Sequence, residues 1–188
     1  MVIPLSSQAL KRLSVFAFGK LPEHGDFVAR GISPGERDAW DAWASASLEE
    51  ARRDLGDVFE TRFEAAPPWR FAFGPGRFAD AWVAGALTPS VDRSGRHFVI
   101  VVGARSGGAL PPDGVGGRVA EIMEAEIYRV FETGGDIDSL VGRAECALLG
   151  VEPDAPSLAA GRFWRLDPPQ ALEVSEPPAN LLSLGLAQ

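Results

Sequence analysis

The strongest constraint on the fold is a pair of apolar segments that a turn joins. Residues 97–102 are almost entirely apolar, so they are expected to form a central strand that is covered on both faces. Residues 81–87 form a second strand-like run, and residues 92–95 between them have the Asp-first, Gly-last signature of a type I turn. The pattern predicts an antiparallel hairpin over residues 81–102, with Ile100 fully buried.

The segment after residue 33 has the pattern of a long helix that covers such a sheet. Ser33 followed by Glu36 predicts a capping box, and apolar residues recur at helical spacing until Gly56 ends or kinks the helix. Trp40 and Trp43 lie on this apolar stripe. They are interpreted as part of a helix packed on a sheet, with a ligand platform as the alternative.

The remaining segments complete an alternation of short strands and helices. A second amphipathic helix is predicted over residues 119–131, and Asp136 is expected to cap a shorter one. Further strands are predicted over residues 15–18, 69–73 and 162–166, and residues 107–117 are a Gly/Pro-rich connector. The sequence therefore predicts an α/β fold of the α+β kind, a mainly antiparallel sheet flanked by helices, in a single domain over residues 1–188.

The balance of charges excludes some classes of partner. The 188 residues contain 18 Lys and Arg against 26 Asp and Glu, a net charge of -8. A nucleic-acid binder needs a basic face to displace counterions from phosphates, and a protein of anionic membrane surfaces needs basic clusters. No apolar run approaches the roughly 20 residues of a membrane-spanning helix. The expected partner is therefore a protein, with no nucleic acid and no membrane insertion.

The single cysteine and the N-terminal segment both indicate a cytoplasmic protein. Cys146 cannot form an intrachain disulfide, and its Ala- and Leu-rich surroundings predict a buried thiol. The basic pair Lys11 and Arg12 follows the first apolar residues, whereas a secretory signal has the reverse order.

Enzymatic chemistry would have to use a small set of polar residues. His24, Asp26, Ser90 and Asp92 could form a metal site or a Ser/His hydrolase if their two segments converge. However, Ser90 lacks the Gly-x-Ser-x-Gly elbow, and the chain has no short histidine motif for a metal. The default interpretation is that these groups make structural salt bridges and hydrogen bonds, and that the chain carries no catalytic residue and needs no cofactor.

Four sequence blocks, read together, resemble one protein family. They are GKLPEHGDFVARG at 19–31, WDAW at 40–43, PWRF at 68–71 and PSVDRSGRHF at 89–98. The chain is similar to the type VI secretion-associated TagF (ImpM) family, most strongly over residues 14–103. The motif residues that are structural or partner-binding candidates are Gly19, Lys20, Pro22, His24, Gly25, Asp26, Phe27, Trp43, Trp69, Pro89, Ser90, Asp92, Arg93, Gly95 and Arg96.

The resemblance implies a cytoplasmic accessory protein that restrains the secretion machine after translation. It implies action through a scaffold that bears a forkhead-associated domain, and no enzymatic activity. The family often has an aromatic residue where this chain has His97 and a proline where it has Val99, which argues against a catalytic role for His97. We expect the polar blocks to have an architectural role, with Asp26 and Asp92 each paired to an arginine without a metal.

Overall fold

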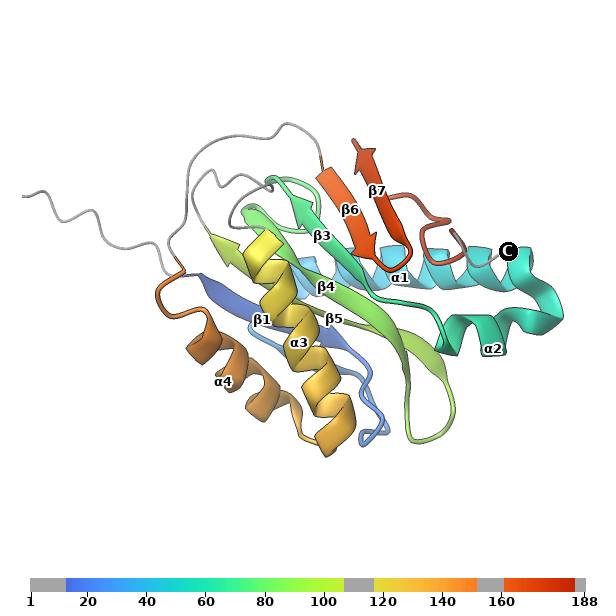
Figure 1. Ribbon diagram of the computed structural model, residues 1–188, viewed down its shortest axis with the longest axis horizontal. Coiled ribbons are helices and arrows are strands. Elements are labelled where there is room, and N and C mark those ends of the chain that lie inside the picture. The colour runs from blue at the N-terminus through green and yellow to red at the C-terminus, as the bar shows by residue number, and fades with distance from the viewer. Residues whose placement is uncertain (1–12, 107–116, 152–160, 185–188) are drawn as a thin grey trace, which may run out of the picture.

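A seven-stranded sheet forms the centre of the molecule. The computed structural model describes residues 13–106, 117–151 and 161–184. Neighbouring strands in the sheet are antiparallel, in the order β2-β1-β5-β4-β3-β6-β7 (Figure 1). The strands are β1 (Ser14–Gly19), β2 (Val28–Arg30), β3 (Trp69–Phe73), β4 (Trp82–Val91), β5 (His97–Ser106), β6 (Gly161–Leu166) and β7 (Pro169–Val174). The helices are α1 (Pro34–Leu55), the short 3-10 helix η1 (Gly56–Val58), α2 (Phe59–Glu64), α3 (Gly117–Thr133) and α4 (Ile137–Ala147). The mainly antiparallel α+β fold predicted from the sequence is confirmed.

The predicted hairpin is the longest strand pair of the sheet. Strands β4 and β5 pair from Trp82 opposite Ser106 to Val91 opposite His97, so β4 continues further toward the turn than predicted. The N–H of Gly95 donates to the carbonyl oxygen of Asp92 at 2.9 Å, which closes the predicted turn. Ile100 is 0% exposed. The prediction of a central hairpin with a buried Ile100 is confirmed.

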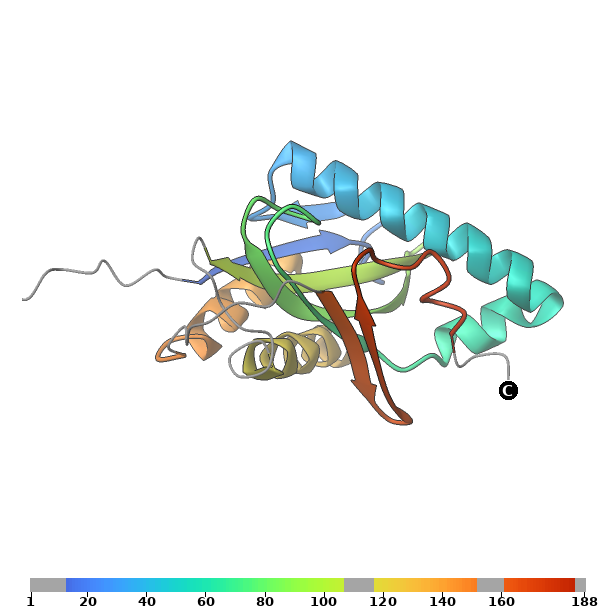
Figure 2. The same cartoon turned by 90° about the horizontal axis from the view of Figure 1, so that it is seen from above.

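Helices cover both faces of the sheet, as the apolar β5 requires. Helix α1 lies on one face, and α3 and α4 lie on the other (Figure 2). The core under α1 is rich in aromatic side chains, whereas the core under α3 and α4 is mostly aliphatic. Trp40 is 1% exposed and stacks on Phe78 with ring centroids 3.6 Å apart. Trp40 is therefore a core residue, and the predicted packing of this helix on the sheet is confirmed.

Local sequence signals set the ends of the helices. Ser33 accepts a hydrogen bond from the Glu36 N–H, and the Glu36 carboxylate accepts one from the Ser33 N–H, so the predicted capping box is formed. The Asp136 carboxylate accepts from the Ser139 N–H at 2.8 Å and caps α4 as predicted. Gly56, with a φ of 52°, follows the last residue of α1.

Several elements escaped the sequence prediction. Strand β2 has three residues, too few for a periodicity to show, and β7 begins at Pro169, where paired prolines predicted a break. Helix α2 follows Gly56 after one 3-10 turn, so of the two alternatives for Gly56 the structure shows the one in which helical structure continues beyond it. Most of the predicted connector over residues 107–117 lies outside the described residues, and its last residue begins α3.

The prediction of a buried thiol is wrong. Cys146 is exposed on α4, because the buried face of this helix carries Ile137, Leu140 and Ala144 instead. A period of 3.6 residues places Cys146 off that face. Across the described residues, none of the helices is long and apolar enough to cross a membrane.

Candidate functional site

The first and last motif blocks lie side by side at one end of the sheet. The loop between β1 and β2, residues 20–27, lies next to the tip of the β4–β5 hairpin, and the C-terminal end of α3 lies at the same end of the molecule (Figure 1). The pairing of β1 with β5 brings the two blocks together, because Gly19 lies opposite Ile100. The Lys20 N–H then donates to the Val99 carbonyl oxygen at 3.1 Å.

A buried ion pair links the loop to the hairpin. The Lys20 Nζ lies 2.6 Å from the Asp92 Oδ2, and their side chains are 6% and 0% exposed. The Arg96 Nε donates to the same oxygen at 2.7 Å. The other oxygen, Oδ1, accepts from the N–H groups of Ser94 and Arg96, each at 2.9 Å. The Asp92 carboxylate therefore accepts four hydrogen bonds, which fills its capacity.

These four donors shift the ionisation of the carboxylate. The hydrogen bond from Lys20 is the largest cause that holds the pKa of Asp92 well below its ordinary value, and the bonds from Arg96 and Ser94 act in the same direction. Burial of the carboxylate opposes them by favouring the neutral form. Asp92 is consequently a fixed negative charge near neutral pH, and a poor acceptor of a proton.

Backbone acceptors on the loop receive further bonds from the hairpin. The Arg93 N–H donates to the His24 carbonyl oxygen at 3.2 Å, and the Arg93 Nη2 donates to that of Glu23 at 2.6 Å. The Arg96 Nη2 donates to the Gly25 carbonyl oxygen. Loops have few regular partners for their carbonyl groups, so these bonds set the shape of the whole segment.

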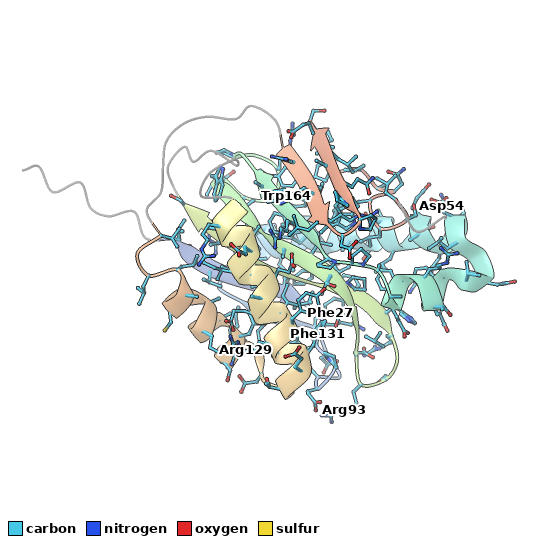
Figure 3. All side chains as sticks on the ribbon, viewed as in Figure 1. Phe27, Asp54, Arg93, Arg129, Phe131 and Trp164 are labelled. Carbon is cyan, nitrogen blue, oxygen red and sulfur yellow. The ribbon has the colours of Figure 1, made fainter. Side chains whose placement is uncertain are left out.

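A cluster of aromatic rings completes this end of the molecule. Phe27 is 49% exposed, stacks on Phe18 at 5.7 Å and meets Phe98 edge-on at 4.7 Å. The Lys20 Nζ lies 5.1 Å from the centroid of the Phe27 ring, within the range of a cation–π contact. In Figure 3, Arg93 is labelled at the bottom of the molecule and Phe27 is labelled above it. We call residues 20–27 and 92–96 together the loop–hairpin surface.

Of the two predicted aspartate–arginine pairs, the structure contains the one at Asp92 but not the one at Asp26. Asp92 pairs with Arg96, as expected. The expectation for Asp26 is wrong, because Asp26 is exposed and the described residues offer it no ion pair. The reason is its position: the loop turns its backbone carbonyls, and not the Asp26 side chain, toward the arginines of the hairpin.

Two of the four residues of the enzymatic alternative are engaged in the polar network of the loop and the hairpin. The Ser90 hydroxyl is buried and donates to the Lys20 carbonyl oxygen at 2.7 Å, and Asp92 is held by Lys20 and Arg96. No contact joins the His24 ring to either residue in the described part of the chain. Among the described residues, no three or more His, Cys, Asp or Glu side chains are arranged to hold a metal ion.

The other motif residues lie within the fold. Trp69 is 3% exposed, and the Arg165 guanidinium lies over its ring at 4.7 Å. The part-buried Trp43 donates to the Pro178 carbonyl oxygen at 3.3 Å. The pairing of β4 with β3 ends at Leu87, and Pro89 lies beyond it in β4. The missing N–H of Pro89 therefore does not interrupt the hydrogen bonds between β3 and β4. Pro22 and Gly25 are exposed in the loop.

Sequence reasoning missed the pairing of Lys20 with Asp92. Lys20 is one of only two lysines in a chain whose other basic residues are arginines, which was a usable signal. Reasoning from the sequence also missed Arg105, which donates to Glu36 and to the Gly31 carbonyl oxygen and so ties β5 to the start of α1. Arg105 lies 69 positions from Glu36 and 74 positions from Gly31 in the sequence, so no local sequence pattern could reveal these contacts.

Acid is expected to destabilise the fold. The pKa of Asp92 lies below its ordinary value, as does that of Asp136, which accepts from the Ser139 N–H. A carboxyl with a lowered folded-state pKa contributes stability that is complete above its unfolded pKa of about 4 and is lost as the pH falls through the folded value. The unfolding free energy from urea titrations should change little above about pH 5 and fall from there toward pH 2. An Asp92→Asn chain should show a shallower fall; an equal slope in both chains would contradict the role of Asp92.

The chain is similar to known proteins both in sequence and in fold. The sequence model of the TagF N-terminal domain, described as type VI secretion system-associated, matches residues 17–141. The crystal structure of PA0076 from Pseudomonas aeruginosa PAO1 superposes with a TM-score of 0.70 at 24% sequence identity. The match covers 90% of this chain and 92% of that one, and it shows a shared fold. Comparison with curated protein sequences gave no match.

Proposed function

The chain belongs to the TagF N-terminal domain family of type VI secretion system-associated proteins, and from this membership we propose that it restrains type VI secretion after translation. The match over residues 17–141 is the observation that carries the proposal. The proposed protein is cytoplasmic, and it acts by binding a protein of the secretion machine. The proposed partner is a scaffold that bears a forkhead-associated domain.

The arrangement of the polar motif residues supports binding in preference to catalysis. Ser90 and Asp92 are engaged by Lys20, and Arg96 closes the same network. General acid–base work needs a group that gains and loses a proton near the working pH, and the lowered pKa of Asp92 makes it unsuited to that task. These residues instead hold a loop in one shape, which lowers the entropic cost of binding a partner. The proposed function therefore has no catalytic residue and no cofactor.

Loss of the gene is expected to raise type VI secretion in the source bacterium. Deletion should increase the amount of tube protein in the culture medium, and overexpression should suppress it, because a repressor limits assembly or firing of the machine. The measurement is an immunoblot of the tube protein in cells and medium. A His24→Ala chain should still repress, because no step of the proposed mechanism transfers a proton.

Two outcomes would favour other functions. If deletion left secretion unchanged, the regulatory role would be wrong. If the purified chain hydrolysed an ester or phosphoester and His24→Ala abolished that activity, the hydrolase built on His24, Asp26, Ser90 and Asp92 would replace it. The abundance of each variant in cells is the control, so that a degraded chain is not mistaken for an inactive one.

A further inference from the structure

Phe27 differs from the other exposed apolar side chains of the described residues. The large exposed ones are Phe27, Val58, Tyr128, Leu149 and Leu166. Among these five, Phe27 alone is held by ring contacts, with Phe18 behind it and Phe98 at its edge. An aromatic ring that is exposed and already fixed in position loses little conformational entropy when a partner covers it. Phe27 thus has the properties of an interface anchor.

The surroundings of Phe27 are equally rigid. The loop that carries it is held by the Lys20–Asp92 pair and by the hydrogen bonds that Arg93 and Arg96 donate to the carbonyl groups of Glu23 and Gly25. These bonds connect residues about 70 positions apart in the sequence. A fixed surface of this kind presents the same shape before and after binding, which favours affinity.

Two guanidinium groups on this surface keep hydrogen-bond donors that the fold does not use. A guanidinium has five N–H donors and no acceptor. Arg93 uses one of them, on Glu23, and Arg96 uses two, on Asp92 and Gly25. Both side chains are exposed, so their remaining donors face solvent. A partner that covers them must supply acceptors, and carboxylates match the forked guanidinium best.

In the described part of the chain, no ion pair joins the exposed carboxylates of this surface to Arg93 or Arg96. The Asp92 carboxylate is buried, and its charge is compensated by Lys20 and Arg96. The Glu23 carboxylate lies beside Gly134, at the turn between α3 and α4. Asp26 is left as an exposed acceptor at the rim, able to receive a donor from the partner.

From these observations we propose that the loop–hairpin surface is where the protein partner docks, a proposal that rests on the proposed function. The partner presents an apolar pocket for the Phe27 ring, with carboxylates beside it for Arg93 and Arg96. The net charge of -8 describes the whole chain and would favour a basic partner, whereas the unused donors of Arg93 and Arg96 provide a local binding site for carboxylates of the partner.

The test uses two variants with matched controls in the full chain. Phe27→Ala removes the anchor, and Arg93→Glu reverses a charge. Tyr128→Ala and Arg118→Glu make the same changes at exposed positions on α3. The purified forkhead-associated scaffold of the same secretion system is the probe, and repression of secretion in a deletion strain is the second readout. Each of the first two variants should raise the Kd at least about tenfold and relieve repression, and the controls should do neither.

The possible results separate this proposal from the proposed function. If Phe27→Ala and Arg93→Glu bind and repress as the wild type does, the docking surface is wrong and the regulatory function stands. If the wild-type chain neither binds nor represses, the regulatory function fails, and the docking surface fails with it. Melting temperatures are measured for all four variants. If Phe27→Ala is unstable, the Arg93→Glu and Arg118→Glu pair decides, because both positions are exposed.

Discussion

Replacing Asp92 with asparagine is expected to lower the melting temperature by about 10 °C. The substitution keeps the shape of the side chain but leaves the Lys20 ammonium buried without its counter-charge. Breaking a buried pair from one side is costly, because the remaining charge has lost its water and gains nothing in return. The measurement is thermal unfolding followed by circular dichroism at pH 7.

Two control chains make this prediction specific. Asp26→Asn changes the same residue type in the same surface, but Asp26 is exposed and has no ion pair in the described part of the chain, so its melting temperature should stay within about 2 °C of the wild type. A double variant, Asp92→Asn with Lys20→Met, should lose less stability than Asp92→Asn alone, because both members of the pair become neutral. Equal losses in the two aspartate variants would contradict the assignment.

Replacing Gly19 with alanine is expected to lower the melting temperature by more than about 10 °C or to prevent folding. Gly19 has a φ of 136°, a conformation that side chains disfavour. A Cβ at this position would lie 2.0 Å from the Val99 carbonyl oxygen, which is the acceptor of the Lys20 N–H. The strands would have to separate where the loop begins, so the Lys20–Asp92 pair would be displaced as well.

Gly25→Ala is the matched control for Gly19→Ala. Gly25 lies in the same sequence block, but no atom lies within 4 Å of the position its Cβ would take. Its melting temperature should remain within about 2 °C of the wild type. Circular dichroism and the yield of folded protein report both substitutions. If the Gly19→Ala chain had the same melting temperature as the Gly25→Ala chain, β1 and β5 would tolerate a side chain between them, and the prediction would be wrong.

Together these variants test whether the motif residues shape the surface that binds. Asp92 is buried within this surface and Gly19 is buried next to it, whereas Phe27 and Arg93 are exposed on it. The first two substitutions should therefore act through stability, and the latter two should weaken binding by more than any change in their melting temperatures explains. The two sets of measurements distinguish a misfolded surface from a folded surface that lacks its contacts.

Local patterns in the sequence were enough for the main elements and for the family. The apolar run of β5, the turn that begins at Asp92 and the capping signals at Ser33 and Asp136 act over a few residues, so each could be read directly. The motif blocks identified the family for a related reason, since a loop and a turn of special shape need particular residues at particular positions.

Only the tertiary structure determined which polar side chains are buried and which residues they pair with. Asp26 and Asp92 are the same residue type in the first and last motif blocks, yet one is exposed and the other is buried against Lys20. Asp92 pairs with Lys20 because β1 pairs with β5, which brings together residues some 80 positions apart in the sequence. The exposure of Phe27 was decided in the same way. Burial and charge compensation are properties of packed surfaces, and a linear pattern of residues carries no record of which surfaces will meet.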